Sequence, residues 1–260
     1  MDIVTFSVTQ FEFFVLILSR SSGIMIFAPF YSSISWPFQL KAMFSLMLAL
    51  ILFPVVPKTG VVIPGELSQL IALSASELLV GLLIGFTARV FFTGFLMAGQ
   101  IMGRSIGFII ANVVDPLSGD NISIIGQLLF LFVVVVFLIL GGHRWLLRLL
   151  AYSFHSVPVG TCALTPEVTG VVSRAFANIF SIGVELASPV LIATFAIMVA
   201  LGFIARAVPQ MNIFAVGFAL KIMIGLVTFY FCIPFMRGYF VRVFAQMTTD
   251  VHTVIKLLSS

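Results

Sequence analysis

The stretch FLFVVVVFLIL, from Phe130 to Leu140, consists entirely of apolar residues. Its apolar residues do not alternate with polar ones, as they would in a strand of a transmembrane β-barrel. The charge-free run that contains it, between Asp120 and Arg144, exceeds the ~20 residues that a membrane-spanning helix needs. Because backbone groups in hydrocarbon must find hydrogen-bond partners within the chain, we expect an α-helix here.

The composition of the whole chain agrees with this stretch. Of its 260 residues, 61% are hydrophobic and only 8% are charged, whereas soluble domains carry about 25% charged residues. Long uncharged runs also separate Glu185 from Arg206 and Lys221 from Arg237. No internal repeat is evident. The sequence therefore predicts an all-α, multi-pass integral membrane protein that forms one unit over residues 1–260.

Proline and glycine divide the chain into helices and loops. PVVPKTGVVIPGE (Pro54–Glu66) is too rich in them to be helix interior, and HSVPVGTCALTPE (His155–Glu167) also reads as a loop. Thr165 and Pro166 favour a helix start, as N-cap and first helical residue. The predicted helices cover about residues 9–29, 40–53, 67–106, 122–140, 168–207 and 214–235, with a short helix after GGHRW (141–145); the last two long helices allow internal breaks.

The end of the chain carries an amphipathic pattern over residues 238–258. Apolar residues recur there at helical spacing, and polar residues gather on another face. The pattern predicts a C-terminal amphipathic helix that lies on a membrane surface or on a partner. The apolar set is Phe240, Phe244, Met247, Val251, Val254 and Leu258, and the polar set is Arg242, Gln246, Thr249, Thr253 and Lys256.

Positive charges do not give the chain a simple membrane orientation. Lys and Arg normally gather in cytoplasmic loops, but here they occur near both ends of successive apolar segments and inside some of them. We therefore expect helical hairpins and broken helices, so that counting apolar segments as single crossings misstates the topology.

Several classes of function find no support in the sequence. The three histidines and the cysteines Cys162 and Cys232 lack metal-ligand spacing, so we expect no metal or cofactor and two apolar thiols. No nucleotide-binding or catalytic motif is present, so we expect no enzyme. The net charge of +4 is not concentrated in a run that would bind nucleic acid. We also expect no removable signal at the N-terminus.

GFIIANVVDPLSGDN (Gly107–Asn121) places a polar turn between apolar segments. Its proline, glycine and acidic residues are typical of chain reversal. Apolar bulk beside a hydrated turn suits a loop that projects into an aqueous pore. An exposed loop at the membrane edge, or an Asp115–Asp120 pair that binds a coupling ion, are the alternatives. The candidate loop residues are Phe108, Ile109, Ile110, Asn112, Val113, Val114, Asp115, Pro116, Gly119, Asp120 and Asn121.

Glycines four residues apart precede this loop. Gly99, Gly103 and Gly107 form two overlapping GxxxG steps on one helix face. Small residues at this spacing let another helix approach closely, either within the chain or in a neighbouring subunit. Gln100 and Arg104 share another face, where a guanidinium needs a partner or water. We expect a wet interior or a polar subunit seam there.

A break is predicted in ARAVPQMNIFAVGFALK (Ala205–Lys221). Pro209 should end the preceding helix, and the amides of Gln210 and Asn212 need hydrogen-bond partners wherever they are buried. We expect Pro209, Gln210, Asn212 and Phe214 to seat the chain against a neighbouring subunit. The lining of a transport pathway or a simple loop outside the membrane would fit the same composition.

Four motifs together resemble one family. They are PQMNIFAVGFALK (209–221), GQIMGRSIGF with NVVDP (99–116), GGHRWLL (141–147) and FHSVPVG (154–160). Their order and spacing resemble the FliR family of flagellar type III export-gate proteins, which is similar to the SctT family of injectisomes. The resemblance covers almost the whole chain.

This resemblance implies a structural and gating subunit, not an enzyme, of the channel that passes unfolded flagellar subunits across the bacterial inner membrane. It implies a place in the flagellar basal body, with FliP-type and FliQ-type gate subunits and FlhB-type and FlhA-type export components as partners. The loop at residues 108–123 would enter the central pore as a plug beneath FliP methionines. The helices would form hairpins in a gate held largely above the bilayer plane, which would account for the distribution of charge.

Two other functions remain as alternatives. An injectisome export-gate subunit would differ in what it exports. A self-contained secondary transporter would use Asp115, Arg104 and the break at Pro209 as its site. Most such transporters carry an internal repeat, and the sequence shows none.

Overall fold

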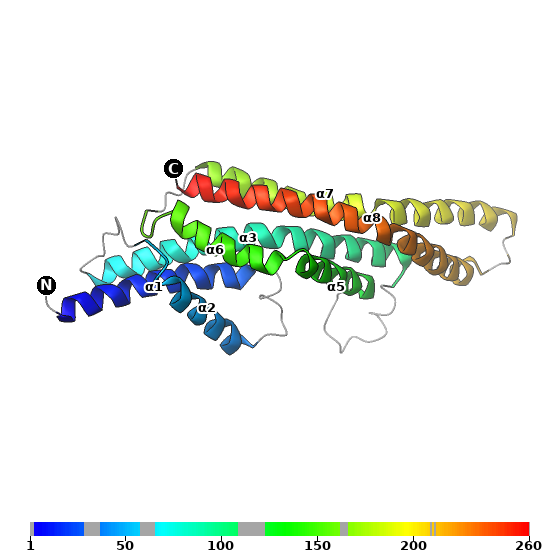
Figure 1. Ribbon diagram of the computed structural model, residues 1–260. Helices are drawn as coiled ribbons and strands as arrows, with labels where there is room; N and C mark the ends of the chain where they lie inside the picture. The colour runs from blue at the N-terminus through cyan, green and yellow to red at the C-terminus, as the bar shows by residue number, and fades with distance from the viewer. Residues whose placement is uncertain are drawn as a thin grey trace. The chain divides into compact units, whose positions relative to one another are not determined.

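The protein is described here by a computed structural model. All regular structure in the described ranges is α-helical (Figure 1), which confirms the predicted all-α fold. The described residues are 3–28, 37–57, 66–108, 123–161, 166–208, 210 and 212–259. The helices are α1 (Ile3–Phe27), α2 (Phe38–Leu52), α3 (Leu67–Ile106), α5 (Ile124–Ile139), α6 (Gly142–Ser156), α7 (Pro166–Ala207) and α8 (Ile213–Leu258).

Among the described residues, four helical segments are long and apolar enough to cross a membrane: Val8–Phe27, Leu67–Ile106, Glu167–Ala207 and Ala215–Leu258. The pair α5 and α6 becomes a fifth candidate if it is counted as one bent span. The helices α3, α7 and α8 contain 40, 42 and 46 residues. At 1.5 Å per residue each is about 60–70 Å long, about twice the thickness of a hydrocarbon core. Helix length therefore does not show that each of these helices crosses the membrane once.

Three helix boundaries differ from the predicted ones. The helix α1 begins at Ile3, six residues before the predicted start near residue 9. The helix α6 begins at Gly142, so the HRW of GGHRW forms its first turn instead of a loop before it. The segment 238–258 is not a separate helix, because α8 continues through Pro234 from Ile213 to Leu258. An internal proline removes one backbone hydrogen bond, and apolar helices tolerate it when neighbouring groups satisfy the freed carbonyl.

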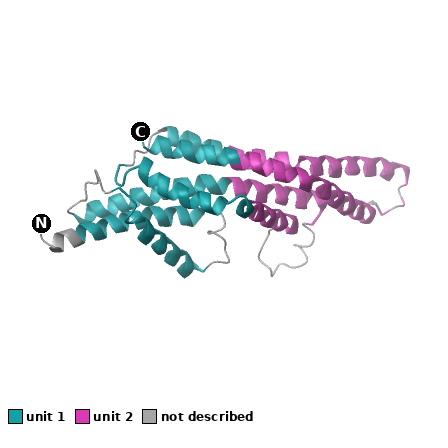
Figure 2. Ribbon diagram, viewed as in Figure 1, with its two compact units in different colours: residues 1–90, 137–175, 245–260 teal, residues 91–136, 176–244 magenta. Residues whose placement is uncertain are grey.

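The chain divides into two compact units (Figure 2). Unit 1 comprises residues 1–90, 137–175 and 245–260, and unit 2 comprises residues 91–136 and 176–244. Each unit is thus assembled from segments that are far apart in the sequence. The helices α3, α5, α7 and α8 contribute residues to both.

In unit 1, α1 and α3 approach closely where glycine meets glycine. A Cβ on Gly81 would lie 2.3 Å from the carbonyl oxygen of Arg20 and 3.0 Å from the Cα of Gly23. A Cβ on Gly23 would lie 2.5 Å from the carbonyl oxygen of Leu78. Only glycine at both positions permits this backbone-to-backbone contact. Apolar side chains surround it, including the buried residues Leu16, Ile17, Ile24, Val80 and Ile84.

The predicted apolar face of the C-terminal segment is confirmed. Phe244 is half-buried, and all five residues of the predicted polar face are exposed. The chain itself covers this face, so the expected contact with a membrane surface or partner is wrong for these side chains. Their burial in the fold already removes the apolar area from water. The buried members are Phe240, Met247, Val251, Val254 and Leu258.

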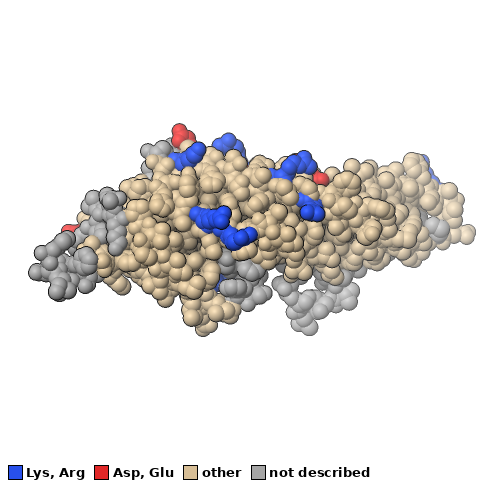
Figure 3. Space-filling view, viewed as in Figure 1, with Lys and Arg blue, Asp and Glu red and all other residues tan. Residues whose placement is uncertain are grey.

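Other apolar side chains remain uncovered. Phe203, Phe231 and Phe235 are 69%, 65% and 80% exposed. In the face shown in Figure 3, Lys and Arg occupy only scattered positions on a mostly uncharged surface. Soluble monomers rarely expose apolar patches of more than a few hundred Å². Such a surface suits lipid or neighbouring subunits.

The close contact between α1 and α3 gives a first prediction. Gly81→Ala should lower the free energy of unfolding by about 1–3 kcal/mol, because the added methyl group overpacks the contact. Thermal unfolding of the full chain in detergent measures this change. Gly170→Ala is the matched control, since a Cβ there meets nothing within 4 Å and alanine favours helix by up to about 1 kcal/mol. Equal unfolding temperatures for the two variants would contradict the close contact.

Candidate functional site

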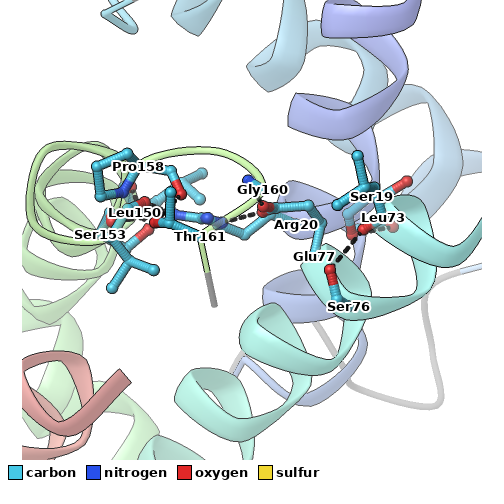
Figure 4. Close-up of polar contacts among 12 residues, drawn as sticks. Ser19, Arg20, Leu73, Ser76, Glu77, Leu150, Ser153, Pro158, Gly160 and Thr161 are labelled. Atoms are coloured by element: carbon cyan, nitrogen blue, oxygen red, sulfur yellow. Dashed lines mark hydrogen bonds and ion pairs between the residues drawn. The ribbon is translucent and has the colours of Figure 1, made fainter. Parts of the chain in front are cut away.

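Arg20 of α1 and Glu77 of α3 form a buried ion pair in unit 1 (Figure 4). Both side chains are 0% exposed, and Arg20 Nε lies 2.5 Å from Glu77 Oε2. A charge enters an apolar interior only when it is paired and hydrogen-bonded. The pair therefore fixes α1 and α3 relative to each other within this unit.

The same arginine also reaches the end of α6. Its Nη1 donates hydrogen bonds to the carbonyl oxygens of Ser153, at 3.0 Å, and Val157, at 2.8 Å. Its guanidinium carbon lies 4.5 Å from the centre of the Phe154 ring. The last carbonyls of a helix lack partners within the helix, and a cation there also interacts favourably with the helix dipole. Arg20 thus satisfies and stabilises the C-terminal end of α6.

Glu77 holds the segment that follows α6. Its Oε1 accepts a hydrogen bond of 2.8 Å from the backbone N–H of Gly160, as Figure 4 shows. Gly160 has a φ of 86°, a left-handed conformation that glycine adopts without steric cost. The motif FHSVPVG (154–160) therefore supplies a ring, a carbonyl and a glycine N–H to one buried pair. We call Arg20, Glu77 and these contacts the clamp of unit 1.

The sequence patterns did not predict the clamp. Neither Arg20 nor Glu77 belongs to a motif that indicates their pairing. The usable signal was the presence of one acidic and one basic residue inside apolar helices, because such residues pair with each other. The pairing itself spans 57 positions of sequence, so no local pattern reveals it.

In unit 2, α3 ends at Ile106, directly before the predicted loop. Gly107 has a φ of 109°, and the backbone N–H of Phe108 donates to the carbonyl oxygen of Gly103 at 3.0 Å. This is a glycine-terminated helix end, in which the positive φ of Gly107 lets the chain leave the helix. Phe108 is half-buried. The other loop residues, Ile109, Ile110, Asn112, Val113, Val114, Asp115, Pro116, Gly119, Asp120 and Asn121, lie outside the described residues, and their role remains a prediction.

Gly99 and Gly103 pack against the beginning of α5. A Cβ on Gly99 would lie 2.5 Å from the Cα of Gly126, and a Cβ on Gly103 would overlap the hydroxyl of Ser123. Of the two interpretations of the GxxxG steps, packing within the chain is therefore the one observed for these two glycines. Because α3 precedes the predicted loop and α5 follows it, this contact holds the two ends of the loop together. We call it the loop base.

Further contacts anchor the end of α3 in unit 2. The hydroxyls of Ser105 and Thr194, on α3 and α7, lie 2.5 Å apart. Ile106 is fully buried, and a Cβ on Gly225 of α8 would lie 2.6 Å from its Cγ1. Three helices, α5, α7 and α8, thus hold the residues from which the loop departs.

The polar face of α3 remains without a partner in the described part of the chain. Gln100 is half-buried and Arg104 is exposed. An exposed guanidinium on a mostly apolar helix needs water or an acceptor from another subunit. The predicted wet interior or polar seam is compatible with this exposure and stays a prediction.

The predicted break at Pro209 is confirmed, because α7 ends at Ala207 and α8 begins at Ile213. Pro209 itself and the side chain of Phe214 lie outside the described residues. Gln210 and Asn212 are exposed. Asn212 Oδ1 accepts a hydrogen bond of 3.2 Å from the backbone N–H of Ala215, as an N-cap does. The Oδ1 of Asn212 therefore has a partner in its own helix, and a contact of this residue across a subunit seam stays a prediction.

These features define a class of protein. The chain has the features of an integral membrane protein of helical hairpins. These features are helices of 40 or more residues, exposed apolar faces and a charged pair enclosed by three segments. Within the described residues, no three His, Cys, Asp or Glu side chains gather as a metal site.

Residues 11–247 match the family described as "Bacterial export proteins, family 1", and the chain belongs to this family. It is 28% identical over 241 residues to the flagellar biosynthetic protein FliR of Escherichia coli (strain K12), which covers 93% of this chain and 92% of the relative. It is 29% identical over 252 residues to FliR of Bacillus subtilis (strain 168), with coverages of 96% and 95%. FliR of Aquifex aeolicus (strain VF5) is 28% identical over 233 residues.

The clamp gives a second prediction. Arg20→Met should cost about 3–5 kcal/mol of unfolding free energy, because it leaves Glu77 charged and buried without a partner. Adding Glu77→Met should recover much of this loss, since the buried charge is then gone. Thermal unfolding of the full chain in detergent compares both with Arg206→Met, which removes an exposed arginine. Equal unfolding temperatures for the Arg20→Met variant, the double variant and the Arg206→Met variant would show that the clamp does not stabilise the fold.

The N-cap gives a third prediction. Asn212→Ala should destabilise the first turn of α8 by about 0.5–2 kcal/mol, because the N–H of Ala215 loses its acceptor. Gln210→Ala, also exposed, is the control and should change stability little. Hydrogen exchange of the amides at the start of α8 measures the effect. Faster exchange in the Gln210 variant than in the Asn212 variant would show that the cap is assigned to the wrong residue.

Proposed function

We propose that this chain is the FliR-type structural and gating subunit of the flagellar type III protein export channel. The observation that carries the proposal is full-length similarity: relatives named flagellar biosynthetic protein FliR align over at least 92% of both chains. The family match over residues 11–247 supports it independently. In this role the chain passes unfolded flagellar subunits and is needed for flagellum assembly, without catalysing a reaction itself.

The loop base supports a plug. A plug must move or yield at its tip while its two ends stay fixed. The residues on both sides of the loop are held by Gly99, Gly103 and Gly126, and the Ser105–Thr194 hydrogen bond secures the same end of α3. On this proposal, residues 108–123 enter the pore, where apolar side chains exclude water as hydrophobic constrictions do in channels.

The exposed apolar surface supports partner subunits. We assign FliP-type and FliQ-type gate subunits to it, with FlhB-type and FlhA-type export components nearby, in the inner membrane at the flagellar basal body. Exposed aromatic side chains such as Phe203 and Phe231 would be covered by helices of these neighbours. Arg104 and Gln210, both exposed, would then find acceptors or donors across the seam. The energy for export would come from partners and the proton-motive force.

Disrupting the gene in the bacterium that encodes the chain tests this function. We expect cells without flagella, whose medium lacks secreted flagellar subunits, and recovery of both when the full chain is supplied again. Loss of injectisome secretion with intact flagella would instead establish the alternative export gate. Loss of small-solute uptake with normal flagella would establish a secondary transporter. Either outcome would overturn the proposal.

The plug gives a fourth prediction. Deleting Ile110–Gly119 should leave the gate assembled but leaky, because the apolar seal is removed while the loop base is retained. Small-solute influx into cells with idle secretion measures the leak, and co-purification with FliP-type and FliQ-type subunits checks assembly. Deleting Thr59–Ile63, in the loop between α2 and α3, is the control and should remain tight. An assembled gate that stays as tight without residues 110–119 would rule out the plug.

A further inference from the structure

The helix α6 has two sharply different faces. One face is buried in unit 1, and the clamp holds it there through the carbonyl of Ser153 and the ring of Phe154. The opposite face is exposed and cationic. Its residues Arg144, Arg148, Tyr152 and His155 are all exposed, and at 3.6 residues per turn they fall within an arc of about 80°. We call these four residues the cationic face of α6.

The charge of this face is not compensated. No acidic residue occurs in α6, and neither Arg144 nor Arg148 forms an ion pair within the described residues. Tyr152 makes an edge-on contact with His252 of α8, with ring centres 5.1 Å apart, so an imidazole from a second helix lies beside the face. A surface of this kind favours an anionic ligand.

The helix α5, which precedes α6, indicates which kind of molecule carries that anion. The helix α5 has the most apolar composition of all the described helices. Apart from Gln127, its exposed residues are large and apolar, and α6 follows it after only the break at Leu140–Gly141. Along the chain, a face suited to hydrocarbon is thus followed directly by one with arginine and tyrosine, as occurs at a membrane–water boundary. The exposed apolar residues of α5 are Ile124, Leu128, Leu131, Val135 and Ile139.

We propose that the cationic face of α6 binds the phosphate groups of anionic membrane lipids of the phosphatidylglycerol type. Guanidinium groups bind phosphate through paired N–H donors, and exposed tyrosine suits the headgroup level of a bilayer. The helix would lie at the membrane surface with its buried face against unit 1, in the manner of an interfacial amphipathic helix. An acidic protein segment would satisfy the arginines equally, but it would not account for the apolar face that precedes them. This inference does not depend on the export function.

Native mass spectrometry of the full chain in a neutral detergent tests this binding. Phosphatidylglycerol is titrated, with phosphatidylcholine as the lipid lacking net charge. A cation near an anionic surface contributes about fivefold to binding. We therefore expect Arg144→Gln with Arg148→Gln to weaken phosphatidylglycerol binding about 25-fold, and Arg148→Gln alone about fivefold. Replacing both arginines by lysine should restore most of the binding.

A charge-matched control variant distinguishes the loss of this particular face from a general loss of positive charge. Arg174→Gln with Lys256→Gln removes two exposed cations elsewhere in unit 1 and should keep phosphatidylglycerol binding within about threefold of the intact chain. Equal loss in this control, unchanged binding in the Arg144 and Arg148 variants, or equal binding of phosphatidylcholine would overturn the proposal. So would full competition by inorganic phosphate at the same concentration, which would indicate a site for free anions. Loss of a co-purifying protein with lipid binding intact would identify an acidic partner instead.

Discussion

A charged pair with no access to water dominates the structure of unit 1. Arg20 and Glu77 are both 0% exposed. Each charge is tolerable because the other partner and the backbone of residues 153–160 form hydrogen bonds with it, although Arg20 Nη2 has no acceptor within the described residues. Three segments must therefore meet in one register before the pair can form. The same requirement fixes which face of α6 is buried, and hence which face is presented outward. Through these contacts the segment FHSVPVG (154–160) has a structural role in unit 1.

Glycine supplies the second constraint. At Gly23 and Gly81 in unit 1, and at Gly99 in unit 2, helix backbones approach so closely that a single added Cβ would collide with backbone atoms. Close approach replaces the hydrophobic driving force that is missing between helices in lipid. In unit 2 this contact lies at the two ends of the predicted plug loop. A gate needs such a fixed base if only the loop is to respond to a passing chain.

Much of the fold was predictable because apolar runs, proline and glycine act locally. The helix over residues 67–106, the break near Pro209, the helix end at Gly107 and the buried face of residues 240–258 all follow from patterns within a few turns. The clamp was not predictable in this way, since its partners lie 57 and more positions apart. The cap at Asn212 was available as a local signal, because asparagine before a helix is a favoured N-cap, but the residue was interpreted as a seam contact. Continuation of α8 through Pro234 depends on packing that the sequence does not display.

The central claim is that this chain is a gate subunit whose loop closes a pore formed with other proteins. A cryo-electron microscopy map of the full chain co-expressed with its FliP-type and FliQ-type partners tests it most directly. The account predicts a hetero-oligomeric ring in which residues 108–123 lie inside the central pore, above a loop base formed by Gly99, Gly103 and Gly126. A chain found alone or in a homo-oligomer, or a loop that points away from the pore in the assembled ring, would contradict it.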